Sequence, residues 1–346
     1  MWRWCVAAVP IAQLLAAYAH SYTKPSGTLA MVGIFKNEAD ALHEWLTHHF
    51  AQGVAHAYLI DNNSSDAWPQ ALARLGSQRS RVTVVSDATP HAQVELYNKH
   101  FLKRVQEGSH SWVMVVDADE FIYAPRRFAS SIPDVLATAI PRLSPAVELG
   151  WKVFGSTADP RQPAVGIRRG FLRRARYDDP PTGSELKRGV RGPNGFKSKS
   201  IVRTACLRRF IIHNHELRWP WCIGALTARY PTLLPSLPFV HAASEAALAV
   251  SPLHLNHYRV QSFEYFMTKK APRGDVLNAA GDSLHTPRYF QFFNRTEVFD
   301  DALARIASGA SDAAVLTTAT AGDRQHGRNH SYGRHRTVGG TGHRAI

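Results

Sequence analysis

Short apolar segments alternate with segments of helical periodicity between Leu29 and Val116, and this alternation limits the folds open to the chain. The apolar segments are nearly continuous, which is typical of strands buried on both faces. Strands that alternate with helices in this way build a parallel sheet covered by helices. The predicted strands are 29–35, 57–60, 82–85 and 112–116, and the predicted helices are 36–50, 71–75 and 91–106. The predicted fold class is therefore α/β.

Polar side chains follow three of these predicted strands. The three clusters are Lys36-Asn37-Glu38, Asp61 to Asp66, and Asp117 to Glu120. In parallel sheets ligands bind at the carboxyl ends of the strands, near the point where the strand order reverses. We therefore expect the three clusters to converge on one ligand site.

The rest of the chain is less regular. After residue 125, strands are expected at 151–155 and 199–202, and a strand leading into an amphipathic helix at 253–270. Residues 306–346 have the composition of a disordered basic tail. The apolar run from Trp4 to Ala19 predicts a signal peptide or a short signal-anchor within residues 1–24, with a buried helix as the alternative. Membrane association would use this segment.

Charge and cysteine content narrow the classes of partner. The formal net charge is +14, and residues 168–209 contain thirteen Lys or Arg against three acids. Such a stretch suits an anionic partner, namely a nucleotide, a nucleic acid or a membrane surface, and equally suits a solvated basic loop. Cys206 and Cys222 show neither zinc-ligand nor redox-motif spacing. The two cysteines could form a disulfide in an oxidising compartment.

The pair Asp117 and Asp119 lies at D-x-D spacing directly after a buried strand. Two carboxylates so placed can hold a hard divalent cation, which bridges phosphate oxygens and neutralises the charge on a departing phosphate. A haloacid-dehalogenase-type phosphatase would carry its aspartate after the first strand, not the fourth. A sugar nucleotidyltransferase would carry a Gly/Arg-rich loop after the first strand, where only Gly33 occurs. Neither G-x-x-x-x-G-K-[ST] nor G-x-G-x-x-G is present.

Residues 29–275 resemble the glycosyltransferase family 92 and its bacterial family 2-like relatives. The matching residues, in order, are Lys36-Asn37-Glu38, Glu44-Trp45, His49, Gly53-Val54, Asp61 to Asp66, Gln93, Tyr97-Asn98, Trp112, Asp117, Asp119-Glu120-Phe121, Trp151, Phe154-Gly155, Lys199 to Arg203, His213, His257-Tyr258, Ser262 and Lys270. The resemblance implies a GT-A (Rossmann-like) nucleotide-diphospho-sugar transferase fold with a mixed, mainly parallel central sheet. Residues 25–305 would form this domain, with a nucleotide-binding half (25–125) and an acceptor half (126–305).

The resemblance also implies an activity and a site. A sugar would move from a nucleotide donor, UDP-linked, to a glycan or other glycoconjugate hydroxyl, with Mn²⁺ or Mg²⁺; galactose is suggested by resemblance only. Family 2-like enzymes usually invert the anomeric centre, using a carboxylate as general base, for which Glu148, Glu185 and Glu216 are candidates. The implied residues are as follows: catalytic Asp117, Asp119 and Glu120; nucleotide-sugar-binding Lys36, Asn37, Glu38, Asp61, Asn62, Gln93, Lys199 and Arg203; and metal-binding Asp117, Asp119, His257 and His213.

Two other functions compete with this one. A non-catalytic relative could bind sugar nucleotides without transfer, and a polyanion- or nucleic-acid-binding protein could use the basic stretch 168–209, with salt-sensitive affinity. The second alternative leaves the acids at three strand ends unexplained, so no nucleic-acid partner is expected. The expected location is the secretory pathway, at the Golgi membrane or lumen, with a cytoplasmic or membrane-associated protein as the alternative.

Overall fold

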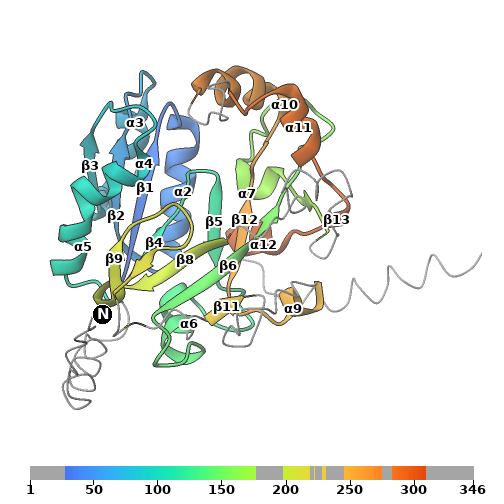
Figure 1. Cartoon of the computed structure of the whole chain (residues 1–346). Coiled ribbons are helices and arrows are strands. Elements are labelled where there is room, and N and C mark those ends of the chain that lie inside the picture. Colours follow the sequence, from blue (N-terminus) through green and yellow to red (C-terminus); the bar gives the residue numbers. More distant parts are fainter. Residues whose placement is uncertain are drawn as a thin grey trace, which may run out of the picture. The chain divides into compact units, whose positions relative to one another are not determined.

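A computed structural model describes residues 28–176, 198–218, 222, 228–230, 245–274 and 283–308 of the 346-residue chain (Figure 1). All of them belong to a compact unit formed by residues 1–310. The predicted N-terminal signal or anchor segment, nearly all of the predicted tail and residues 177–197 of the basic stretch, including Glu185, lie outside the described residues. Within the described ranges, no helix is long and apolar enough to cross a membrane.

The centre of the fold is a nine-stranded sheet, with the order β3-β2-β1-β4-β8-β6-β12-β5 and with β11 beside β6. The strands are β1 (Leu29–Phe35), β2 (Val54–Asp61), β3 (Val82–Ser86), β4 (Trp112–Val115), β5 (Glu120–Tyr123), β6 (Ala146–Val153), β7 (Arg173–Arg174), β8 (Ser198–Arg203), β9 (Leu207–Arg209), β10 (Glu216–Leu217), β11 (Ala228–Tyr230), β12 (His254–His257) and β13 (Val298–Phe299). Strand β1 is parallel to β2 and β4, β2 is parallel to β3, and β6 is parallel to β12 and β11. Strand β8 is antiparallel to β4 and β6, and β5 is antiparallel to β12. The predicted mixed, mainly parallel α/β sheet is therefore confirmed.

Short helices surround this sheet. They are α2 (Ala39–Ala51), α3 (Trp68–Ala73), η1 (Gly76–Arg81), α4 (Gln93–Tyr97), η2 (Asn98–Leu102), α5 (Lys103–Glu107), α6 (Ile132–Thr138), α7 (Ile167–Gly170), η3 (Thr204–Cys206), α9 (Glu245–Ala249), α10 (Phe263–Tyr265), η5 (Phe266–Lys270), η6 (Ala271–Arg273), α11 (Pro287–Phe293) and α12 (Ala302–Ala307). Elements α4, η2 and α5 follow one another without a break and correspond to the helix predicted at 91–106. Elements η2 and η5 are π-helical.

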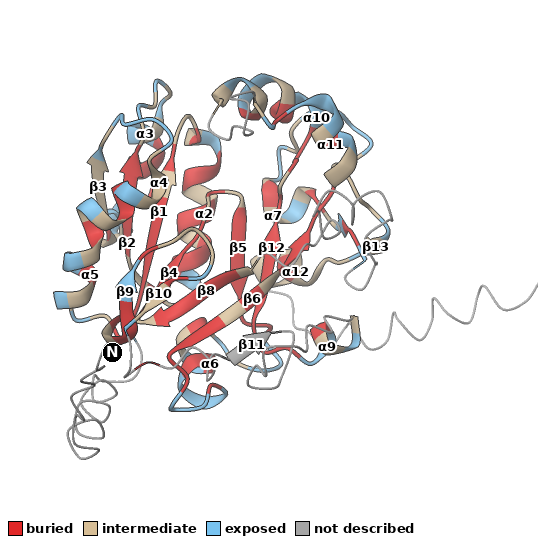
Figure 2. Cartoon of the chain, viewed as in Figure 1, coloured by how far each residue is buried: buried red, intermediate tan, exposed pale blue. Residues whose placement is uncertain are grey.

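Strands β1, β2 and β4 of the N-terminal half are largely buried on both faces, as their continuous apolar runs predict, whereas the edge strand β3 is only partly buried. Along β1, Met31 and Phe35 pack into the core that includes α2, whereas Ala30 and Val32 pack into a second core with residues of α4, η2 and α5. Figure 2 shows β1, β2 and β4 almost entirely buried. Because side chains alternate between the faces of a strand, two helical layers require an apolar residue at nearly every position.

Strand β5 was not predicted, and it changes the geometry of the D-x-D segment. Residues 120–123 turn back directly after Asp119, so that β5 pairs with β12 rather than continuing the parallel array. The pairing places His257 opposite Glu120 in register. The sequence did not reveal β5, because its apolar run from Phe121 to Tyr123 is only three residues long. The sheet thereby joins the D-x-D segment to a strand more than 130 residues away.

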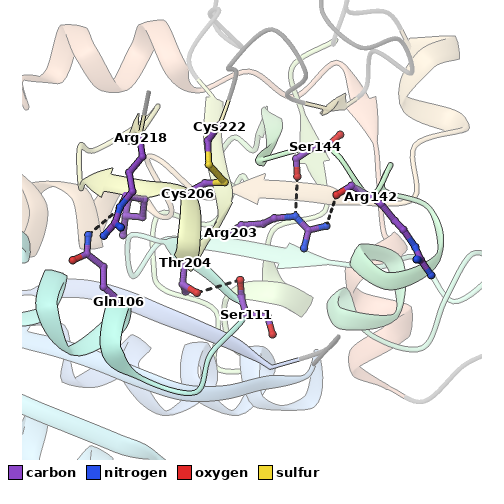
Figure 3. The surroundings of a disulfide bond; sticks show 10 residues. Gln106, Ser111, Arg142, Ser144, Arg203, Thr204, Cys206, Arg218 and Cys222 are labelled. Carbon is purple, nitrogen blue, oxygen red and sulfur yellow. Dashed lines mark hydrogen bonds between the residues drawn. A yellow bond between two sulfur atoms is a disulfide. The ribbon is translucent and has the colours of Figure 1, made fainter. Parts of the chain in front are cut away.

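A disulfide joins Cys206, in η3, to Cys222, with Cα atoms 5.5 Å apart (Figure 3). Both cysteines are buried. The bridge closes a loop with a sequence separation of 16, which limits the conformations of the unfolded chain. The sequence left this pairing open, and the structure resolves it.

Replacing both cysteines by alanine is expected to lower the free energy of unfolding by about 3 kcal/mol, from the entropy of a loop of this length. Urea unfolding of the wild type and the double variant measures the difference. Reducing agent should lower the stability of the wild type by a similar amount and leave the variant unchanged. A wild type insensitive to reduction would show that the bridge is not formed in solution.

Candidate active site

A cavity of about 500 Å³ opens at the carboxyl ends of β1 and β4. Its walls come from the loops after these strands, from the start of α4, and from the segment that follows β12. The charged and polar residues of the lining include Lys36, Glu38, Asn62, His91, Gln93, Asp117, Asp119, His213, His257, Arg259, Lys270, Arg273, His285 and Tyr289. The polar clusters after β1, β2 and β4 therefore do converge, as the parallel topology predicts.

Asp117 lies at the base of this cavity in a fixed network. Lys199, from β8, places its ammonium Nζ 2.8 Å from Asp117 Oδ2 and 3.3 Å from Glu120 Oε2. The backbone N–H of Asp117 donates to Glu120 Oε2 at 3.0 Å, and the Gln93 amide lies 3.4 Å from Asp117 Oδ1. Burial opposes the charge of Lys199, but Asp117 and Glu120 together raise the pKa of its ammonium group.

Glu120 supports the site from behind. It is fully buried, it does not line the cavity, and its Oε1 has no hydrogen-bond partner within the described part of the chain. Burial raises its pKa to about 8 against the opposing effect of Lys199, with Asp117 and Asp119 adding to the rise. The position of Glu120 suits it to hold the D-x-D turn and does not suit it to touch a substrate.

Asp119 is held by residues of the C-terminal half. Lys270 Nζ lies 2.6 Å from Asp119 Oδ2, and His257 Nε2 lies 3.4 Å from Oδ1. The backbone N–H of Tyr258 donates to the Asp119 carbonyl at 2.9 Å. Burial alone would raise the pKa of Asp119, but Lys270 and His257 outweigh it and hold the pKa well below its usual range. Asp119 is therefore ionised at neutral pH.

A third ion pair lies on the cavity wall between Glu38 and Arg273. Burial raises the pKa of Glu38, while the Arg273 guanidinium opposes the rise. Arg259 lies nearby among aromatic rings, 5.4 Å from the Trp151 centroid and 3.9 Å from that of Phe293. Its Nε donates to the hydroxyl of Tyr289. Lys36 and Arg259 contribute positive charge to the lining without a carboxylate partner among the described residues.

Four of the residues predicted to bind the nucleotide line the cavity: Lys36, Glu38, Asn62 and Gln93. Asn37 and Asp61 serve the neighbouring turns instead. Asn37 Oδ1 accepts the N–H of Ser65 at 2.7 Å, and Asp61 Oδ1 accepts the N–H of Ser64 at 2.9 Å. Asn37 also has a φ of 54°, in the left-handed region that asparagine tolerates.

The position of Arg203 corrects the sequence-based prediction that this residue contacts the diphosphate. It pairs in register with Trp112, at the start of β4 and so at the opposite end of the strand from Asp117. Its Nε donates to the carbonyl of Ser144 at 3.0 Å (Figure 3). The guanidinium lies over the Trp112 ring at 4.2 Å. The length of β8 explains the error, because Lys199 lies near the start of this six-residue strand and Arg203 at its end.

Comparison with known proteins finds sequence similarity to glycosyltransferase family 92 proteins. A glycosyltransferase family 92 protein of Oryza sativa subsp. japonica is 24% identical over 261 residues, 75% of this chain and 38% of that protein. Another, of Ricinus communis, is 33% identical over 122 residues, 34% of this chain and 21% of that protein. The chain is therefore similar to glycosyltransferase family 92 proteins. It spans well under half the length of either of these two family 92 relatives, and no protein-family model matches it.

Solved structures of glycosyltransferases also align with parts of the chain. A mannosyltransferase from Pyrobaculum calidifontis in complex with GDP-Man and Mn²⁺ has a TM-score of 0.28 at 18% identity, over 44% of this chain and 46% of its own. TarS from S. aureus in complex with UDP has a TM-score of 0.31 at 16% identity, over 52% of this chain and 48% of its own.

The predicted metal ligands do not form a complete coordination sphere in this structure. Asp117, Asp119, His213 and His257 all line the cavity. Nevertheless, no group of three or more His, Cys, Asp or Glu residues within the described ranges is close enough to hold a metal ion. One carboxylate oxygen of each aspartate already accepts a lysine ammonium, Asp117 Oδ2 from Lys199 and Asp119 Oδ2 from Lys270. The residues present therefore do not fit a divalent cation without rearrangement, and the predicted Mn²⁺ or Mg²⁺ remains a prediction.

Several cavity residues were not singled out from the sequence. Arg259, Arg273, His285 and Tyr289 line the C-terminal wall. Arg273 could have been suspected from its place just beyond the predicted helix at 253–270, next to Gly274, whose φ is 60°. Of the proposed general bases, Glu148 and Glu216 do not line the cavity.

Proposed function

We propose that the protein is a glycosyltransferase that moves a sugar from a nucleoside-diphosphate donor, UDP-linked, to the hydroxyl of a glycan or other acceptor, with inversion. The observation that carries the proposal is the cavity at the carboxyl ends of β1 and β4, with Asp117 and Asp119 at its base. This is the ligand edge of a doubly wound sheet. The relationship to family 92 proteins supports the same activity. Galactose is the first sugar to test.

The residues of this chain have separable roles in such a transfer. Lys36 and Arg259 supply uncompensated positive charge for a diphosphate. Asn62 and Gln93 offer amides to the nucleoside or to the phosphates. Trp151 presents an aromatic ring to the cavity and contacts His257 at 4.4 Å between centroids.

The basic stretch gives little support to the polyanion-binding alternative. Three of its cations are paired inside the fold, namely Arg168 with Glu44, Arg174 with Glu245 and Asp300, and Lys199 with Asp117 and Glu120, and the exposed Arg209 pairs with Glu216. Such pairs compensate their charge locally. The described part of the stretch is therefore largely structural.

A location in the secretory pathway is part of the proposal. The disulfide between Cys206 and Cys222 supports it, because disulfides form and persist mainly in oxidising compartments. Fractionation of cells that express the tagged full chain tests this location.

Calorimetric titration with UDP, GDP and ADP tests the donor class. We expect saturable binding of UDP, and we expect Lys36→Ala to weaken it about tenfold, or about 1.4 kcal/mol, through loss of a charged contact. Lys103→Ala is the matched control, because Lys103 lies on α5 with 84% of its side chain exposed. If none of the nucleotides binds, the donor proposal is wrong. If binding is found, transfer from UDP-galactose and other UDP-sugars is then assayed on glycan acceptors.

A further inference from the structure

Every carboxylate that lines the cavity has its own cation. The pairs are Asp117 with Lys199, Asp119 with Lys270, and Glu38 with Arg273. Lys36 and Arg259 add two further positive charges to the lining. The described lining and its direct partners therefore carry an excess of positive charge, although they contain the D-x-D carboxylates.

The two lysines are built into the fold and do not lie on flexible surface segments. Lys199 is 1% exposed on β8, at the centre of the sheet, and its Nζ bridges Asp117 and Glu120. Lys270 ends the π-helical turn η5, and its Nζ also donates to the carbonyl of Arg259 at 2.8 Å. Removing an ammonium from water is costly unless it is paired and hydrogen-bonded. The ion pairs and hydrogen bonds of both lysines therefore hold their ammonium groups in place.

This arrangement conflicts with the usual requirement of a hard divalent cation. Such a cation binds where several oxygens present uncompensated negative charge. Here an ammonium group lies 2.8 Å from Asp117 and 2.6 Å from Asp119. A metal ion between these carboxylates would meet repulsion from two buried positive charges in a medium that screens poorly. Displacing either lysine would leave a buried cation without its partner.

We propose that Lys270 and Lys199 take the place of the divalent cation, so that the donor diphosphate is bound through the cations of the chain itself. Lys270 contacts the diphosphate together with Arg259 and Lys36, and Lys199 is a positioning residue that fixes Asp117. The inference rests on the proposed function. It states which residues of the same site neutralise the negative charge of the donor diphosphate.

The first experiment is calorimetric titration of the wild type with UDP, once in EDTA and once in Mn²⁺. We expect the two dissociation constants to agree within about threefold. Binding at least tenfold tighter with Mn²⁺ would overturn the inference and leave the proposed function standing. Absence of UDP binding in both buffers would instead refute the proposed UDP donor, so the two failures are distinguishable.

The second experiment uses Lys270→Met, with Lys103→Met as the control for loss of an exposed lysine. In EDTA, Lys270→Met is expected to bind UDP at least tenfold more weakly than the wild type. Mn²⁺ should restore part of this loss, because Asp119 then presents an uncompensated carboxylate. Circular dichroism confirms that the variant is folded before titration. Unchanged binding by folded Lys270→Met in EDTA would show that Lys270 does not contact the diphosphate. If the variant does not fold, the comparison of wild type in EDTA and Mn²⁺ still decides the inference.

Discussion

Replacing Asp119 by asparagine is expected to lower glycosyl transfer at least about 100-fold, equivalent to about 2.7 kcal/mol of transition-state stabilisation. Asp119 orients Lys270 and His257 toward the cavity, through contacts of 2.6 Å and 3.4 Å. The variant should also lose about 3 kcal/mol of stability, because breaking a buried ion pair leaves Lys270 charged and unpaired. Initial rates with a UDP-sugar and urea unfolding measure the two effects.

The double variant Asp119→Asn/Lys270→Met separates function from folding. It removes both charges of the pair, so its stability should return to within about 1 kcal/mol of the wild type, since a buried ion pair is often replaceable by neutral side chains. Transfer should stay low, because both groups that face the donor are gone. Recovery of transfer together with stability would mean that the pair only supports the fold.

The edge of the sheet that carries the site could be predicted from local sequence, because short segments show which residues form strands and where polar residues follow them. The clusters at Lys36, Asn62 and Asp117 each follow an apolar strand, and parallel pairing carries them to one edge. Trp45 of α2 lies in the core behind this edge, where it is 1% exposed and its indole N–H donates to the Glu120 carbonyl at 3.0 Å.

The charge state of the site could not be predicted in this way. Lys270 reaches Asp119 across 151 positions of sequence, and Lys199 reaches Asp117 across 82. These approaches depend on the antiparallel placement of β8 and on the return of β5 alongside β12, neither of which leaves a periodic signal. A D-x-D sequence therefore predicts where a diphosphate site lies more reliably than it predicts what neutralises the charge.

Acidification from pH 7 to pH 5 is expected to destabilise the fold by several kcal/mol, owing to four buried histidines. They are His48, His49, His215 and His254. Burial lowers the pKa of His49 and of His215 to about 3, and those of His48 and His254 fall well below the ordinary value. At these four sites the unfolded chain, with histidine pKa values near 6.5, thus binds more protons than the folded one as the pH falls below 6.5. The stability that the four histidines contribute is therefore fully present above pH 6.5 and is lost as the pH falls.

Hydrogen bonds at two of these histidines show why they stay neutral. His49 donates from Nδ1 to the carbonyl of Trp45 at 2.9 Å, and its Nε2 accepts the N–H of Ile122 at 3.3 Å. His48 donates from Nε2 to the carbonyl of Ile122 at 2.8 Å, and its Nδ1 faces the guanidinium of Arg168 at 3.5 Å. A second proton on either ring would oppose an N–H donor, so protonation requires this part of the core to open.

The expected loss at pH 5 is about 2 kcal/mol for each of His49 and His215, against a typical total stability of about 5 to 15 kcal/mol. Urea unfolding at half-unit intervals from pH 7.5 to pH 5 measures the slope, which gives the number of protons taken up on unfolding. His49→Gln should remove about one proton from this number, whereas His43→Gln, on the partly exposed side of α2, is the matched control. A flat profile above pH 5 would contradict the assignment, because neutral buried histidines must be protonated when the chain unfolds in acid.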